Sequence, residues 1–307
     1  MQIIALCNKK ENIDQLLQSK ADIVAIGCNK FSDKTQAILA KEEFKSLLDK
    51  AKAANKKLYA YLDAFIYDIM IPELEELLVY FNEIKLDGVI FNDLGINQIC
   101  FEKNLSLDLI YDPKALITNY EQFPFFKKNK IDTVVLANEL KEKEVIECCQ
   151  NKKDMKLAKQ VSGYVFIMES RWQLITEFLK KNQINADLND KKVYIKEETR
   201  EFPSIIHQNE FGTHIYTGYV LSNMQYLKEL NDAGLDFILI DGLLHSDEWL
   251  NKTIDVYSKA INDFSNTSKY VEEEKAINKD EFVSSGFISN NPKDLKYVPE
   301  NTKEELE

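Results

Sequence analysis

The stretch KLYAYLDAFIYDIMIPELEELLVYFNEIKLDGVIFND, residues 57–93, contains the repeating unit that decides the fold. Residues 57–65 and 87–93 are near-continuous apolar runs that end in polar residues, which is typical of parallel strands covered on both faces. Between them, residues 72–85 space their apolar side chains as an amphipathic helix does, and Pro72 suits the first position of that helix. The stretch therefore predicts a strand, a helix and a second strand in one β–α–β unit.

The same unit recurs along the chain. Eight apolar runs are each followed by a polar residue, and helical patterns lie between most of them; the runs are residues 2–7, 22–28, 57–65, 87–93, 107–112, 132–138, 164–170 and 236–242. Eight alternating units favour an α/β fold of the (β/α)₈ TIM-like barrel type, with a doubly wound sheet as the alternative. We expect the barrel to span residues 1–264.

Composition narrows the class of protein. The 307 residues are 45% hydrophobic and 29% charged, as in a folded globular protein, and the net charge is −12. A protein that grips nucleic acid by itself usually has a basic face, so standalone RNA binding is disfavoured. The first residues do not read as a signal peptide, and no apolar run approaches the length of a membrane span. We expect a cytoplasmic protein with no membrane contact.

The five cysteines are Cys7, Cys28, Cys100, Cys148 and Cys149. None forms a CxxC pair, and none has a histidine at the spacing of a zinc finger. Their odd number and apolar surroundings predict buried, reduced thiols.

Polar residues close the predicted strands. Because the active sites of such barrels lie at the carboxyl ends of the strands, these residues are the first candidates for chemistry. They form a largely acidic ring that would suit a small polar molecule or a cation, although each could instead cap the next helix. The catalytic candidates among them are Asn92, Asp93, Glu139, Ser170 and Asp241.

Two segments break the β–α rhythm. Residues 171–219, here called the lid, contain a helical pattern at 171–181 and strand patterns at 193–198 and 202–208, with a turn at 209–212. We expect the lid to lie over the active face; the alternative makes residues 171–181 the seventh barrel helix. Residues 265–307 read as a polar tail that is partly disordered or docked on the surface.

The stretch EETREFPSIIHQNEFGTHIY, residues 197–216, allows several kinds of site. His207 and His214 could converge on a metal with Glu198, although a simple cross-strand pair on a hairpin fits equally, and we predict no metal. Ser170 could be a nucleophile if His214 or His245 approached it. Two carboxylates at the mouth of the barrel, the end where its strands finish, could form an acid–base pair.

Two arginines of the lid segment suit carboxylate ligands. Arg171 and Arg200 could each bind a carboxylate in bidentate fashion, which makes them candidates for substrate binding together with Glu198. Arg200 could equally form a structural ion pair with Glu198. His214, next to the turn of the lid, is a further catalytic candidate or a support for the lid.

Five blocks of the sequence resemble peptidase family U32, the collagenase-like peptidases. They are FNDLG (91–95), TNYEQFPFFKKNKIDTVVLANEL (118–140), GYVFIMESRWQLI (163–175), EETREFPSIIHQNEFGTHIY (197–216) and YLKELNDAGLDFILIDG (226–242). The second block adds Asn119 as a substrate-binding candidate. The resemblance runs from the first strand to about residue 264.

Within that family the chain is most similar to short members that occur beside a longer paralogue. The resemblance implies a subunit of a prephenate-dependent system that hydroxylates the wobble uridine of tRNA, in complex with the longer paralogue and with tRNA reached through that complex. Longer members carry cysteines for an iron–sulfur cluster near residue 170, where this chain has Ser170, Arg171 and Trp172. We therefore expect no cofactor bound by this chain, prephenate as a co-substrate, and the cluster in the partner. A family-type peptidase acting through the barrel mouth and a non-catalytic structural partner are the alternatives.

Overall fold

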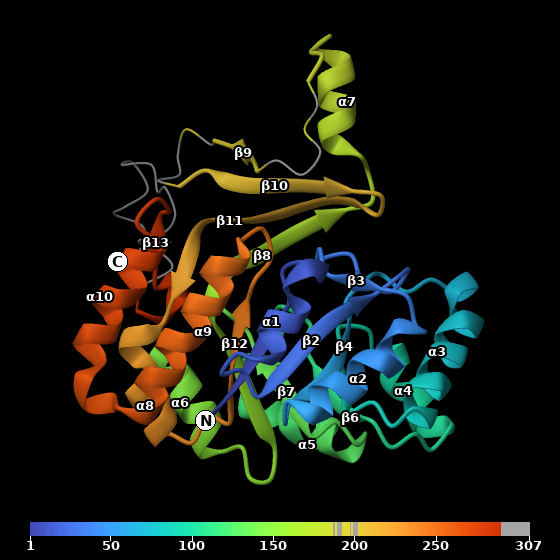
Figure 1. Ribbon diagram of the computed structural model, residues 1–307, viewed down its shortest axis with the longest axis horizontal. Coiled ribbons are helices and arrows are strands. Elements are labelled where there is room, and N and C mark those ends of the chain that lie inside the picture. Colours follow the sequence, from blue (N-terminus) through green and yellow to red (C-terminus); the bar gives the residue numbers. More distant parts are fainter. Residues whose placement is uncertain (187, 189–191, 197, 199–201, 290–307) are drawn as a thin grey trace, which may run out of the picture.

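The computed structural model describes residues 1–186, 188, 192–196, 198 and 202–289, and it contains a closed barrel of eight parallel strands (Figure 1). Each strand pairs in parallel with the next, and β12 pairs with both β8 and β1 to close the ring. This confirms the barrel and excludes the doubly wound sheet. The barrel strands are β1 (Gln2–Leu6), β2 (Ile23–Cys28), β4 (Lys57–Leu62), β5 (Gly88–Phe91), β6 (Asp108–Tyr111), β7 (Thr133–Leu136), the first half of β8 (Lys156–Ser170), and β12 (Phe237–Asp241).

Helices surround the barrel and cover the outer faces of its strands (Figure 1). Pro72 occupies the first turn of α3, as predicted. Gly234 follows α8 with φ +92°, a left-handed conformation that glycine adopts without strain. The helices are α1 (Ile13–Leu17), α2 (Glu43–Ala53), α3 (Ile71–Glu83), α4 (Leu94–Glu102), α5 (Phe123–Lys128), α6 (Glu142–Gln150), α8 (Leu227–Asp232), α9 (Asp247–Asn262) and α10 (Thr267–Ile277).

Two apolar layers stabilise the barrel. One fills its interior and includes Ile4, Tyr61 and Ile110, all of which are buried. The other lies between the strands and the helices and includes Phe44 and Phe81, whose rings lie 4.9 Å apart. Alternate residues of each strand supply the two layers, which explains why the strand sequences are apolar almost throughout.

The prediction for the seventh barrel strand was wrong in its position. The barrel part of β8 is residues 156–162, which pair with β7 and β12, whereas the apolar run 164–170 is the outer half of the same strand. That outer half leaves the barrel and pairs antiparallel with β11 (Gly212–Ser222). Lys159 and Gln160 interrupt the apolar pattern of residues 156–162, which hid the barrel strand. Glu169 and Ser170 therefore lie beyond the barrel and not at its rim.

The lid lies on the side of the barrel where the strands end. In it, β10 (Ser204–Asn209) pairs with β11 and with the short β9 (Val193–Ile195), while α7 (Leu174–Lys181) projects away from the barrel (Figure 1). Asn209 donates from Nδ2 to the main-chain oxygen of Asp33, in the loop after β2, at 2.7 Å. The lid is thus on the expected face, and the alternative that residues 171–181 are the seventh barrel helix is wrong.

Part of the segment after residue 264 is docked on the rest of the molecule, one of the two possibilities that the sequence left open. Helix α10 packs along α9 and buries Tyr270 and Glu274, and β13 (Val283–Ser284) pairs with β11. A short strand, β3 (Ile38–Leu39), also pairs with β2. Residues 290–307, the rest of the expected tail, lie outside the described residues. Among the helices in the described part of the chain, none is both long and apolar enough to cross a membrane.

Candidate functional site

Three carboxylates gather where the barrel strands end. Asp63 follows β4, Asp112 follows β6 and Asp241 ends β12, and all three are buried. Lys114 lies among them, with Nζ 2.7 Å from Asp112 Oδ2 and 5.1 Å from the centre of the Tyr61 ring. Burial opposes the charge on Lys114, but Asp112 and Asp241 outweigh it and raise the lysine pKa. Burial also raises the pKa of Asp241 to about 6, although Lys114 acts in the opposite direction.

A second lysine lies at the same end of the barrel and connects it to the lid. Lys34 Nζ lies 2.7 Å from Asp33 Oδ1, 2.5 Å from Glu169 Oε2 and 2.7 Å from the main-chain oxygen of Asp63. The side chains of Lys34, Asp33 and Glu169 are 4%, 4% and 8% exposed, so these ion pairs are shielded from water. Such pairs are strong only when every member has a partner, and Lys34 is the lysine that pairs with both carboxylates.

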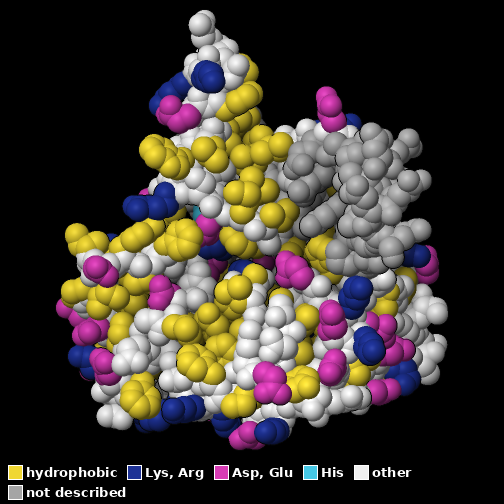
Figure 2. All heavy atoms as spheres, turned by 180° about the vertical axis from the view of Figure 1, so that it is seen from behind, with side chains coloured by type: hydrophobic (Ala, Val, Ile, Leu, Met, Phe, Trp, Pro, Cys, Tyr) yellow, Lys and Arg dark blue, Asp and Glu magenta, His cyan; other side chains and the backbone are white. Residues whose placement is uncertain are grey.

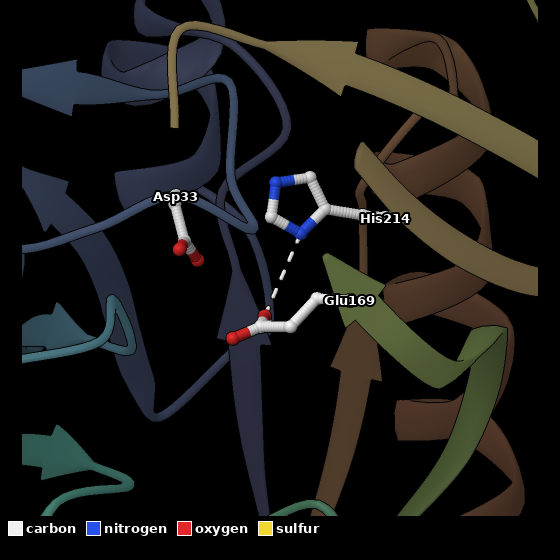
Figure 3. Close-up of side chains that lie close together, drawn as sticks. All are labelled: Asp33, Glu169 and His214. Atoms are coloured by element: carbon white, nitrogen blue, oxygen red, sulfur yellow. Dashed lines mark ion pairs between the residues drawn. The ribbon is translucent and has the colours of Figure 1, made fainter. Parts of the chain in front are cut away.

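His214 completes this second cluster from β11. It is the register partner of Glu169 on β8, and its Nδ1 lies 3.6 Å from Glu169 Oε2 (Figure 3). Its Nε2 lies 3.3 Å from Asn209 Oδ1, and Asn209 in turn binds the main chain of Asp33. We call Asp33, Lys34, Glu169 and His214 the mouth cluster. It joins the loop after β2 to two strands that rise above the barrel.

The electrostatics of the mouth cluster follow from burial around a central cation. Burial opposes the charge on Lys34, but Asp63, Asp33 and Glu169 together raise its pKa. Burial and the nearby Asp63 raise the pKa of Asp33 to about 6, against the effect of Lys34. Burial also opposes the charge on Glu169, yet His214 and Lys34 lower its pKa overall. The cluster therefore holds a carboxylate that is ionised and another that titrates near neutral pH.

Two glycines allow the strands to approach so closely. Gly163, where β8 leaves the barrel, has φ +104°, and a side chain there would place its Cβ 2.3 Å from the main-chain oxygen of Asp241. At the tip of the hairpin, a Cβ on Gly212 would lie 2.1 Å from the main-chain oxygen of Ser170. Both positions tolerate only glycine, because a main-chain oxygen cannot move aside as a side chain can.

The structure brings some of the candidate residues to the mouth. Besides Asp241 and His214, Asn92 reaches it and donates from Nδ2 to the main-chain oxygen of Asp63 at 2.8 Å. Asp93 caps α4 by accepting from the Gly95 N–H at 2.7 Å, which is the structural alternative that the sequence left open. Glu139, after β7, is exposed.

The remaining candidates lie away from the mouth cluster. Asn119 is exposed before a turn of 3₁₀ helix, and Glu198 is exposed in the lid. Arg171 is exposed as well, and its guanidinium carbon lies 4.3 Å from the centre of the Tyr67 ring. Arg200, and with it the ion pair considered for Glu198, lies outside the described residues.

Ser170 faces away from the histidines. It is opposite Thr213 in the β8–β11 ladder, while Glu169 is opposite His214, and neighbouring residues of a strand point to opposite faces. Its Oγ accepts from the Trp172 N–H at 3.2 Å. His245 is held elsewhere, between the rings of Tyr164 and Trp249 at 4.4 and 3.6 Å. The serine–histidine pair that the sequence allowed is therefore not formed.

The sequence reasoning missed Asp33, Lys34 and Lys114. The available signal was a lysine next to acidic residues directly after a strand, in NKFSDK (29–34) and DPK (112–114). Lysines in loops usually face water, so the sequence alone gives little reason to expect that these two are buried beneath the lid.

Among the described residues, the group whose ligand atoms converge as a metal site would require is Asp33, Glu169 and His214, within 4.8 Å of one another. His207 is the register partner of His214 on β10, so the cross-strand pair is formed, but neither His207 nor Glu198 belongs to this group. Lys34 already places its ammonium group against both carboxylates, which supplies the positive charge that a metal would bring.

The cysteines do not suit an iron–sulfur cluster. All five are buried, and they lie after β1, in β2, in α4 and in α6, so no set of four shares one place. Burial raises the pKa of Cys7, Cys28, Cys100 and Cys149 to about 12 each. Clusters are bound by thiolates, and these groups are held as thiols.

Comparisons with known proteins agree with the architecture. The model of peptidase family U32 matches residues 8–297. The chain is 25% identical over 252 residues to "tRNA hydroxylation protein P2" of Bacillus subtilis (strain 168), covering 80% of this chain and 81% of that protein. It is 20% identical over 304 residues to "tRNA hydroxylation protein P1" of the same organism, covering 95% and 71%.

A third relative shows a similar identity, and a solved structure shares the fold. "tRNA hydroxylation protein P" of Helicobacter pylori (strain ATCC 700392 / 26695) is 24% identical over 310 residues, with 95% of this chain and 73% of that protein covered. The structure of the U32 peptidase Mk0906 matches 78% of this chain and 92% of that one, with a TM-score of 0.50 and 16% identity, which supports the fold alone.

Proposed function

The chain belongs to peptidase family U32, and from that premise we propose that it is a subunit of a tRNA hydroxylation system. The observation that carries the proposal is the match to the Bacillus subtilis P2 protein, which covers about four fifths of both chains. The match to the P1 protein of the same organism supports the finer proposal that the subunit works with a longer paralogue, because that protein extends well beyond the matched region.

The net charge supports a role within a complex. At −12, the chain offers little electrostatic attraction for the phosphates of RNA, so tRNA is reached through the partner. The modification that we propose is 5-hydroxylation of the wobble uridine, with prephenate as the co-substrate.

The buried cysteines support the placement of the iron–sulfur cluster in the partner and not in this chain. Their separate positions and raised pKa values leave this subunit without the four thiolates that a cluster requires. Protein purified without oxygen should contain no stoichiometric iron. Iron at one cluster per chain would contradict this part of the proposal.

For prephenate, the described residues favour the exposed Arg171 over the interior of the mouth. Lys34 and Lys114 inside the mouth are already paired with carboxylates of the chain. Arg171 has its guanidinium carbon 4.3 Å from the centre of the Tyr67 ring, and arginine binds carboxylates through its N–H edge. We propose Arg171 as the residue that binds one of the two carboxylates of prephenate.

A test of the proposed function compares tRNA nucleosides from cells with and without this gene by mass spectrometry. We expect 5-hydroxyuridine and the nucleosides derived from it to disappear in the deletion strain and to return when the gene is restored. Unchanged nucleosides, in a strain that carries no second pathway for the modification, would overturn the proposal.

A further inference from the structure

The projecting part of the lid exposes an unusual number of large apolar side chains. We call residues 167–186 the arm; it comprises the end of β8, α7 and the segment that follows. Figure 2 shows hydrophobic side chains over this projection and over the sheet below it. Six of the large apolar residues of the arm are between 42% and 73% exposed: Ile167, Met168, Trp172, Leu174, Phe178 and Ile184.

The exposed apolar area is large enough for an interface. An aromatic side chain buries about 150–250 Å² when fully covered, so six large apolar groups that are about half exposed offer roughly 500 Å². This lies near the upper limit for a patch on a soluble monomer, about 600 Å², and amounts to more than half of one side of a standard interface, about 800 Å².

Helix α7 is held by the described residues at its first turn, where the N–H groups of Leu174, Ile175 and Thr176 donate to Thr213 and Gln208. It has eight residues, and only Ile175 among them is buried. An isolated helix shorter than about 12 residues is marginal in water, so α7 depends on contacts that cover its apolar face. Beyond this first turn, the described elements leave the helix uncovered, and Figure 1 shows it pointing away from the barrel.

The apolar side chains of the arm and the charge of the whole chain favour a protein partner over RNA or an anionic membrane. Arg171, Lys180 and Lys181 outnumber Glu177, because Glu169 is buried against Lys34, so the arm has a small positive surface charge, while the chain as a whole carries −12. Phosphate-rich surfaces would be repelled by the body and weakly attracted by the arm. An apolar protein surface is the complementary partner.

The arm carries both a protrusion and a hollow, which is what a twofold contact between identical chains requires. Trp172, Leu174 and Phe178 protrude. A hollow of about 400 Å³ lies against α7, and its apolar lining is Ile175, Leu179, Ile184, Ala186 and Leu188. From these observations we propose that the arm is a self-complementary interface through which two copies of this chain pair, with Phe178 of each copy near the hollow of the other. The pairing does not depend on the proposed function.

The test is the mass of the full-length protein in solution, measured by sedimentation equilibrium from about 1 to 100 μM. We expect twice the chain mass of 35.6 kDa. In Phe178→Asp we expect the dimer dissociation constant to rise by about 100-fold or more, because losing one hot-spot aromatic costs about 30-fold and the twofold axis repeats the loss.

Phe125→Asp is the matched control. Phe125 is 56% exposed, against 61% for Phe178, and it lies on α5, at the opposite end of the molecule from α7 (Figure 1). This variant should remain a dimer. A second measurement, hydrogen exchange of the amides of residues 174–181, should show slower exchange at 100 μM than at 1 μM, and this readout does not require a variant to fold.

Three results would overturn the proposal. One is a monomer across the whole concentration range; pairing only when a longer family member is added would then assign the arm to that partner. Another is a dimer that Phe178→Asp and Phe125→Asp weaken equally. The last is exchange in residues 174–181 that does not depend on concentration. Each result leaves the tRNA measurement unaffected, so failure of this inference and failure of the proposed function are distinguishable.

Discussion

The barrel and the lid distribute polar and apolar side chains in opposite ways. The barrel buries apolar residues such as Ile4 and Ile110 in its interior. The lid and the outer half of β8 bury charged groups, Glu169 and His214, on the side that faces the mouth. On the arm, large apolar groups such as Trp172 and Phe178 face the solvent.

We therefore expect the barrel to be stable by itself, whereas the position of the lid depends on specific ion pairs. Hydrophobic burial is non-directional and tolerates small changes, whereas a buried ion pair depends on each of its members. The lid is therefore the part of the molecule that a single substitution can release, and the barrel should remain folded when this happens.

The largest expected effect comes from removing the cation of the mouth cluster. Lys34→Met leaves Asp33 and Glu169 buried without a counter-charge, which should lower the free energy of unfolding by about 3–5 kcal/mol in urea titrations. Lys50→Met is the matched control, because the ion pair of Lys50 with Asp14 is solvent-exposed and should contribute little. If the two variants are equally stable, buried charge does not hold the lid.

The passage from barrel to lid offers the next test. Gly163→Ala should cost more than about 1 kcal/mol, because φ +104° is strained for alanine and its Cβ would meet the main-chain oxygen of Asp241. Gly95→Ala, in α4, should be close to neutral, since the higher helix propensity of alanine offsets the small shift of the capping Asp93 Oδ1, which would lie 2.9 Å from the new Cβ. Chemical denaturation of both variants checks the prediction, and a neutral Gly163→Ala would contradict the geometry of β8.

A buried carboxylate outside the mouth cluster should make the stability of the protein depend on pH. Glu274 of α10 accepts hydrogen bonds from Ser222, at the base of the lid, and from Tyr257. Burial raises its pKa to about 7, so the folded state favours the protonated acid. The stability that it contributes is complete below about pH 4.5 and is lost as the pH rises to about 7, by up to roughly 3 kcal/mol.

Glu274→Gln keeps the shape of the side chain and removes its titratable carboxyl group. Unfolding measured from pH 4.5 to pH 8 should therefore show a smaller loss of stability in the variant than in the wild type. Parallel curves for the two proteins would show that Glu274 is not held as the acid.

The smallest effect is expected at Arg171. Arg171→Ala removes the stacking on Tyr67, a contact of an exposed cation that is worth about 0.5–1 kcal/mol. Thermal unfolding should change by no more than this. A loss above 2 kcal/mol would mean that Arg171 has a structural role in the lid, which would weaken its assignment to a ligand.

The same contrast explains which features the sequence could predict. Apolar runs such as residues 22–28 and 87–93 identify strands locally, because both faces of each strand are covered. Residues 156–162 escaped detection because Lys159, although buried, reads as a surface residue. Lys34 escaped because its burial depends on Glu169, which is remote in sequence and reaches it only through the length of β8.

The mouth cluster holds the lid against the barrel, and the most direct test of whether the proposed function needs this contact measures tRNA. The deletion strain would receive Glu169→Gln or the exposed control Glu121→Gln, each at the same protein level as the wild type, and 5-hydroxyuridine-derived nucleosides would be quantified. We expect Glu121→Gln to restore the modification and Glu169→Gln to restore less than about a tenth of it, because the loss of a buried charge weakens the contact between lid and barrel. Full restoration by Glu169→Gln would contradict the account that the ion pairs of the mouth cluster hold the lid as the modification requires.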